Sequence, residues 1–87
     1  MKKQIVGIFT ISTGDKMHLS FYATPGKEKI VMTNPEMGTR IQYSGRRLVQ
    51  FLRDLDSGFN EGMYLWVECN DDVLDQLIVL KNAQAQE

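Results

Sequence analysis

Disulfides, long apolar runs and catalytic side chains are scarce in this sequence. It has one cysteine, one histidine and one tryptophan among 87 residues. The lone Cys69 excludes an internal disulfide framework and a paired-cysteine metal motif, so we expect a reducing, cytoplasmic environment. No apolar run approaches the roughly 18 residues of a transmembrane helix. The run from Ile5 to Ile11 follows two lysines, as in a signal peptide, but it is short and lacks a cleavage site, so we interpret it as a strand.

No catalytic motif compensates for these shortages. His18 and Cys69 lie in different predicted strands, and a cysteine–histidine nucleophile pair would also need a third group to orient it. None of the seven glycines falls in a phosphate-binding glycine motif. We therefore predict that the protein is not an enzyme and that it has no catalytic residue and no cofactor.

Oxygen-bearing side chains are dense in one short segment, which contains Glu68, Asn70, Asp71, Asp72 and Asp75. A hard cation such as Ca²⁺ requires ligands of this kind. Their spacing differs from that of the EF-hand loop, which needs a glycine at its sixth position and a glutamate at its twelfth. We interpret them as turn and helix-cap residues and predict no metal site.

The charges of the two ends of the chain are opposite, although the net charge is only −1. Residues 1–53 carry nine basic and three acidic side chains, a net charge of +6, whereas residues 54–87 carry one basic and eight acidic side chains, a net charge of −7. Such an asymmetry indicates a nucleic acid or a charged protein as partner. Alternatively, the two segments neutralise each other in the folded protein.

Alternating apolar residues and turn signals predict a β-meander over the first 43 residues. The expected strands are 5–11, which is apolar on both faces, 17–22, 30–32 and 40–43, with a turn at residues 24–27. A further strand is expected from Met63 to Cys69. The sequence therefore predicts one α+β domain over residues 1–82, with an antiparallel sheet of about five or six strands and one amphipathic helix packed on one face. Residues 83–87 are expected to fray.

The helix is predicted at about residues 45–57, with Ser44 as N-cap and Gly58 as C-cap. Its buried face has the i, i+3, i+4, i+7 spacing of Leu48, Phe51, Leu52 and Leu55. Arg46 and Arg47 at its start, and Asp54 and Asp56 at its end, oppose the helix dipole. A partner could account for this order of charges, and a solvated basic face is the alternative. The predicted partner-binding residues of this helix are Arg46, Arg47, Gln50, Arg53 and Asp54.

The segment 72–82 fits two structures. Its apolar residues form a broad helical stripe, but the run from Leu77 to Leu80 also resembles a strand that pairs with Met63–Cys69, and we predict this hairpin. The aromatic residues of the sheet are expected on the face opposite the first helix, where we predict a second partner-binding group of His18, Tyr22, Tyr64 and Trp66. A second helix, a second copy in a homodimer or another protein would cover that face.

The leading hypothesis is a small non-catalytic binding protein, a stoichiometric regulator or inhibitor of a larger protein or complex, with no membrane partner. Small inhibitors carried by phages and mobile elements share this general appearance. The alternative is a single-stranded nucleic-acid-binding module, in which aromatic side chains stack on bases and basic ones follow the phosphates. Stacking would use Tyr22, Tyr43 and Trp66, and the anion contacts would use Lys27, Lys29, Arg40, Arg46 and Arg47. The acidic last third of the chain argues against this alternative.

Overall fold

A computed structural model describes residues 3–85 of the chain and confirms the predicted α+β fold. The elements, in chain order, are β1 (Lys3–Thr10), β2 (Lys16–Tyr22), β3 (Lys29–Asn34), β4 (Thr39–Ser44), α1 (Arg46–Asn60), β5 (Leu65–Cys69) and α2 (Asp71–Ala85). The strands form one antiparallel sheet in the order β4-β3-β2-β1-β5. The backbone N–H of Lys27 donates to the carbonyl of Thr24 at 2.8 Å, which confirms the predicted turn.

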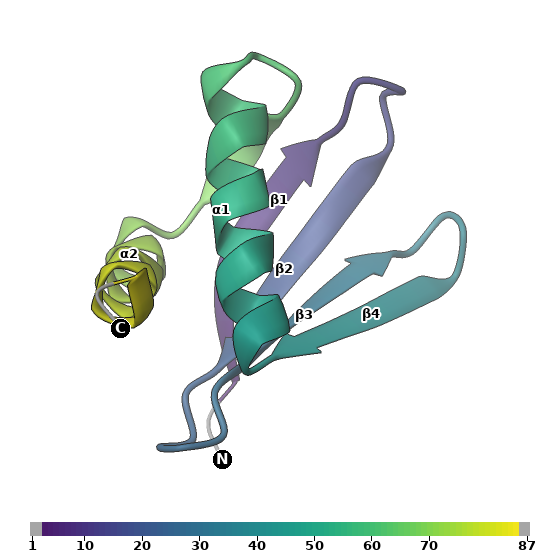
Figure 1. The fold of residues 1–87 in the computed structure, drawn as a ribbon. Coiled ribbons are helices and arrows are strands. Elements are labelled where there is room, and N and C mark those ends of the chain that lie inside the picture. The colour runs from purple at the N-terminus through teal and green to yellow at the C-terminus, as the bar shows by residue number, and fades with distance from the viewer. Residues whose placement is uncertain (1–2, 86–87) are drawn as a thin grey trace.

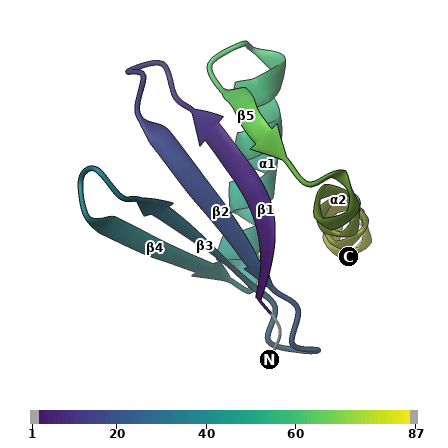
Figure 2. The same cartoon turned by 180° about the vertical axis from the view of Figure 1, so that it is seen from behind.

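Both helices pack on the same face of the sheet (Figure 1). Leu48, Leu52 and Leu55 of α1 are buried, as the helical spacing predicts. Val73 and Leu77 of α2 join the same apolar core, which also contains inward side chains of β1, β2 and β3. Figure 2 shows the sheet from behind, with α1 on its far side. One face of the sheet is therefore covered by two helices and the other by none of the described elements.

Strand β1 contains a bulge that explains its unusual apolar pattern. Ile5 pairs with Ser20 and Gly7 pairs with Leu19, so Val6 is an extra residue in the strand. The bulge lets Val6 and Phe9, three residues apart, both point into the helix-covered core, where they are 0% and 1% exposed. The strand looked apolar on both faces in the sequence because the residues that point into the core change from one alternate set to the other at the bulge.

Helix α1 begins and ends later than predicted. Its N-cap is Gly45, which offers no side-chain hydrogen bond, so the prediction of Ser44 as N-cap is wrong. Gly58 lies inside the helix, and the C-terminal turn is closed by hydrogen bonds from Gly62 N–H to Phe59 O and from Met63 N–H to Gly58 O. Only glycine takes the positive φ of 77° at position 62 without cost, which explains why the helix stops there.

The C-terminal segment is helix α2, so the predicted strand hairpin is wrong. Its stripe of Val73 and Leu77 docks beside β1 and α1, a contact that pairing with β5 would not have allowed. Helix α2 continues to Ala85, and residues 86–87 lie outside the described part, so the fraying of residues 83–87 stays a prediction. Among residues 3–85 no helix is long and apolar enough to cross a membrane.

Candidate functional site

One face of the sheet has no helix packed on it, so its side chains form a candidate binding surface. Cross-strand pairs share a face, so the register identifies its members from the outward residues of β2. We call this surface the open face; it consists of Lys3, Ile5, Ile8, Thr10, Lys16, His18, Ser20, Tyr22, Lys29, Val31, Thr33, Arg40, Gln42, Ser44, Leu65 and Glu68.

The open face is basic although the whole chain is slightly acidic. Four of its sixteen side chains are cationic, and Glu68 is its one carboxylate. The other acidic residues between positions 54 and 75 lie on the two helices or in the loop before β5. The charge asymmetry along the sequence thus becomes, in part, an asymmetry between the two sides of the sheet.

The predicted group of His18, Tyr22, Tyr64 and Trp66 does not form. His18 and Tyr22 lie on the open face, but Trp66 pairs with Phe9 and points to the helix side. The Trp66 ring stacks on the Phe59 ring with their centroids 4.7 Å apart, and the centroids of the Tyr64 and Phe9 rings are 5.2 Å apart.

A bulge at Val67 explains this separation. Ile8 pairs with Glu68, whereas the next residue, Phe9, pairs with Trp66, so Val67 is skipped in the ladder. Strict alternation would place Trp66 and Glu68 on one face of the sheet. The bulge instead turns the tryptophan inward and leaves Glu68 and Leu65 outside. The Tyr64 ring packs closely against Gly58 of α1, and a side chain at position 58 would prevent this, because an added Cβ would lie 2.2 Å from the ring.

The predicted helix-face residues do lie together on the solvent side of α1. Arg46, Arg47, Gln50, Arg53 and Asp54 are all exposed. The Gln50 amide Nε2 donates to Asp54 Oδ1 at 3.0 Å, and the Arg47 guanidinium lies 5.8 Å from the centre of the Tyr43 ring. Arg46 and Arg47 lie in the first turn and oppose the helix dipole, as predicted. Because the helix continues to Asn60, Asp54 lies too far from the C-terminal end to oppose the dipole strongly.

The three predicted anion contacts divide into two places. Lys27 and Lys29 line a groove that reaches Gly45 at the start of α1. Arg40 pairs with Thr33, toward the other end of β4, while Lys29 pairs with Ser44. Lys29 also lies over the Tyr22 ring, with its Nζ 4.9 Å from the ring centre. Lys29 and Arg40 are thus both on the open face, at different ends of it.

Among the described side chains, no direct ion pair joins the basic segment to the acidic segment. Among the side chains that the structure describes, one salt bridge forms, between Lys81 and Asp56, and both partners belong to the acidic segment. The arginines of the basic segment make no such pair within that same part of the chain. The separation of charge seen in the sequence therefore persists in the fold.

His18 and Cys69 lie on opposite faces of the sheet. His18 pairs with Ile8 on the open face, whereas Cys69 pairs with Gly7 on the helix side. Burial raises the pKa of the Cys69 thiol, and its Sγ donates a hydrogen bond to Asp71 Oδ1 at 3.6 Å, which raises the pKa further. Because the two side chains lie on opposite faces of the sheet, His18 cannot act as the base for the Cys69 thiol.

The oxygen-bearing segment forms the entry to α2. Asp71 and Asp72 occupy its first turn, where carboxylates favour the helix dipole. In the described part of the chain, no three histidine, cysteine, aspartate or glutamate side chains gather as metal ligands would.

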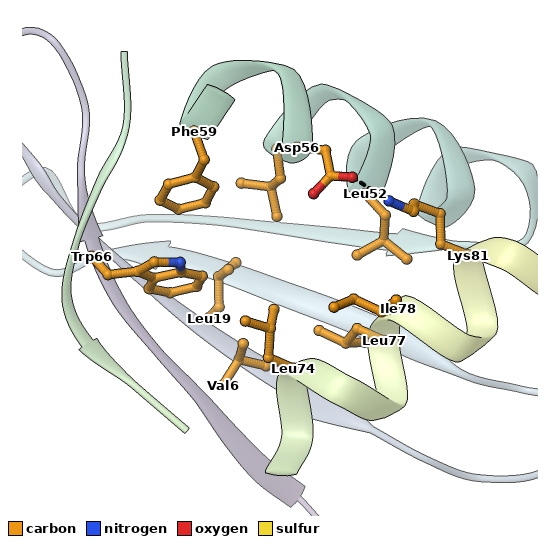
Figure 3. A pocket seen from close by; sticks show the side chains of 11 residues that line it. Val6, Leu19, Leu52, Asp56, Phe59, Trp66, Leu74, Leu77, Ile78 and Lys81 are labelled. Atoms are coloured by element: carbon orange, nitrogen blue, oxygen red, sulfur yellow. Dashed lines mark hydrogen bonds and ion pairs between the residues drawn. The ribbon is translucent and has the colours of Figure 1, made fainter. Parts of the chain in front are cut away.

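A small apolar cavity of about 130 Å³ lies between α1, α2 and the sheet (Figure 3). Leu52, Leu74 and Trp66 are among its walls, and Asp56 on α1 faces Lys81 on α2 beside it. These two charged groups form an ion pair with each other. The cavity could hold at most a small apolar group and lacks the convergent polar groups of an active site.

Comparison of the chain with protein-family models, with curated proteins and with solved structures gave no match. Its function must therefore be argued from the geometry of its own surfaces. The sequence analysis missed much of the open face, in particular Lys16, Ile5 and Leu65. The strict alternation of residues 17–22 could have located Lys16, because it extends the outward row of His18 backward by one step. Nothing in the sequence announces the bulge that exposes Leu65.

Proposed function

We propose that this protein is a non-catalytic binding protein that regulates or inhibits a larger protein by docking its open face on an acidic surface of that partner. The observation that carries this proposal is the excess of four cationic side chains over one carboxylate on a sheet face that neither helix covers. A net charge of −1 for the chain makes this local excess a property of the surface rather than of the whole protein.

Apolar side chains beside the charges favour a protein partner. Ile5 is 56% exposed and Leu65 is 65% exposed on the open face. Aliphatic residues among basic ones match a protein surface with apolar contacts and a polar rim. A single-stranded nucleic acid would instead need aromatic platforms for its bases. Of the three aromatic residues expected to stack on bases, only Tyr22 is on the open face, because Tyr43 stacks on Phe51 and Trp66 on Phe59.

Electrostatic steering gives the acidic start of α2 a second role in this proposal. A surface with one sign of charge raises the association rate with an oppositely charged partner, and the effect weakens with salt. The acidic first turn of α2, at Asp71 and Asp72, would repel the same partner. The basic open face and this acidic turn together would disfavour approaches in which α2 meets the partner first.

The test is a capture experiment with immobilised protein from lysate of the source cells, carried out with and without nuclease treatment. The open-face variant carries Lys16→Glu and Arg40→Glu, which are both exposed. The matched variant carries Arg46→Glu and Arg47→Glu, which reverse the same amount of charge on α1. Circular dichroism confirms that each variant is folded.

We expect one partner protein to bind the wild type and the α1 variant in a salt-dependent manner, and the open-face variant to lose it. Loss with the α1 variant alone would overturn the open-face proposal in favour of the helix face. Capture that disappears on nuclease treatment would overturn it in favour of nucleic acid.

A further inference from the structure

Within residues 3–85 the sheet has two unpaired edges, and they differ in how well they are protected. In the order β4-β3-β2-β1-β5, strands β4 and β5 each present one side without a neighbouring strand. Such edges expose backbone N–H and C=O groups that can pair with another strand, and proteins usually block them with bulges, short strands, proline or charge.

The β5 edge is blocked in several of these ways. The strand has five residues, and the bulge at Val67 interrupts its ladder with β1. Its backbone then turns at Asn70 into α2, whose first turn is acidic. A bulged, short strand next to a helix is a poor template for another strand.

The β4 edge has almost none of this protection. All six of its residues pair in regular register with β3, from Thr39 with Asn34 to Ser44 with Lys29. It has no proline and no bulge, and Tyr43 is its one residue that is not exposed. Arg40 is its one charged side chain. That charge repels a basic strand but attracts an acidic one.

The two sides of β4 differ in chemistry, so they specify the strand that would fit. On the open face, Arg40 lies at one end of β4 and Lys29 pairs with Ser44 at the other. On the helix side, Ile41 is 41% exposed, and Tyr43 stacks on Phe51 with centroids 4.0 Å apart. A strand added here would place alternate side chains beside Arg40, Gln42 and Ser44 on the open face and beside Ile41 and Tyr43 on the helix side.

A second copy of this chain does not fit the edge. An antiparallel pair of two β4 strands would bring Arg40 of one copy toward the chain that follows Ser44 of the other, where Arg46 and Arg47 lie, and would offer Arg40 no carboxylate because β4 contains none. Like charges opposite each other destabilise strand pairs. The occupant that complements the edge is a segment of another protein.

We infer that an extended segment of the partner, with acidic residues alternating with apolar ones, adds to the sheet as a sixth strand along β4. This inference rests on the proposed function, because the segment belongs to the acidic partner that docks on the open face. Backbone hydrogen bonds to the edge supply affinity, and the alternation supplies specificity, as in other cases of strand addition. Its acidic side chains lie beside Arg40 on the open face and its apolar ones beside Ile41.

The probe is a seven-residue peptide that alternates glutamate with valine, capped at both ends. A control peptide has the same composition with its glutamates in one block, so the charge is equal but the alternation is lost. Affinity is measured by fluorescence anisotropy, and the amide hydrogen exchange of residues 39–44 is measured by NMR. Arg40→Glu is compared with Arg53→Glu, which makes the same charge change on the solvent side of α1.

We expect the alternating peptide to bind more tightly than the block peptide. It should also slow the hydrogen exchange of the β4 amides that point away from β3, on the order of ten-fold. Arg40→Glu should weaken binding by about ten-fold, as loss of one charge-assisted contact does, and Arg53→Glu should leave it unchanged. Binding that leaves the β4 amides unprotected, equal binding of the two peptides, or no saturable binding would each overturn strand addition. None of these results would overturn the proposed function, which is tested separately by the capture experiment with the open-face and α1 variants.

Discussion

Replacing Gly7 with alanine should separate β5 from the rest of the sheet. Gly7 has a φ of +154°, and an added Cβ would lie 2.2 Å from the carbonyl oxygen of Glu68. The same atom would lie 3.0 Å from the Trp66 ring and 3.1 Å from the Cα of Cys69. The closest of these contacts is with backbone, so no side-chain rotation relieves it. Strand β5 must move away from β1, and the packing of Trp66 on Phe9 moves with it.

Two effects set how much the free energy of unfolding falls in the Gly7→Ala variant. A backbone conformation that is nearly restricted to glycine costs about 1–3 kcal/mol for alanine. Overpacking against neighbours that cannot rotate away costs about 1–3 kcal/mol more. The Gly7→Ala variant should therefore lose about 4 kcal/mol of its free energy of unfolding, a large part of the roughly 5–15 kcal/mol of a domain.

Urea unfolding followed by circular dichroism and by the fluorescence of Trp66 measures this loss. The control is Gly14→Ala, where φ is +91° but no atom lies within 4 Å of the added Cβ. It should lose only the backbone term, about 1–2 kcal/mol. Equal losses in the two variants would refute the steric argument, and so would a Gly7→Ala variant as stable as the wild type.

Two further predictions test other parts of the fold. Leu77→Ala should lower the free energy of unfolding in urea by about 2–5 kcal/mol, because Leu77 is 1% exposed. Val79→Ala is the control: Val79 is 68% exposed, so its loss should be less than about 0.5 kcal/mol. Similar losses in the two variants would mean that α2 does not belong to the core. The raised pKa of Cys69 should move the pH profile of its alkylation by iodoacetamide to higher pH than in the urea-unfolded protein. Because the folded state holds the thiol proton more tightly, the contribution of Cys69 to stability should fall as the pH rises through the thiol range. Identical alkylation profiles in the folded and unfolded protein would contradict it.

Local patterns in the sequence were sufficient for the strands of the meander and for α1. The buried stripe of Leu48, Phe51, Leu52 and Leu55 follows from helical spacing, and each of these residues is buried in the structure. The ends of α1 were misplaced because Ser44 and Gly58 are acceptable cap residues by type, and the competing glycines at 45 and 62 are as well. The segment 72–82 was ambiguous because a short apolar run satisfies both a helix and a buried strand.

The sequence by itself determined that the chain forms one meander with an amphipathic helix and that its charges are divided between its two ends. The tertiary structure decided which residues reach the open face. One-residue bulges at Val6 and Val67 reverse the alternation of β1 and β5, and they turn Trp66 into the core and Leu65 out of it. A bulge depends on contacts with the neighbouring strand, so it leaves no periodic signal in the sequence. The packing of α2 on the same side as α1 likewise depends on long-range contacts, and it is what leaves the basic face of the sheet open.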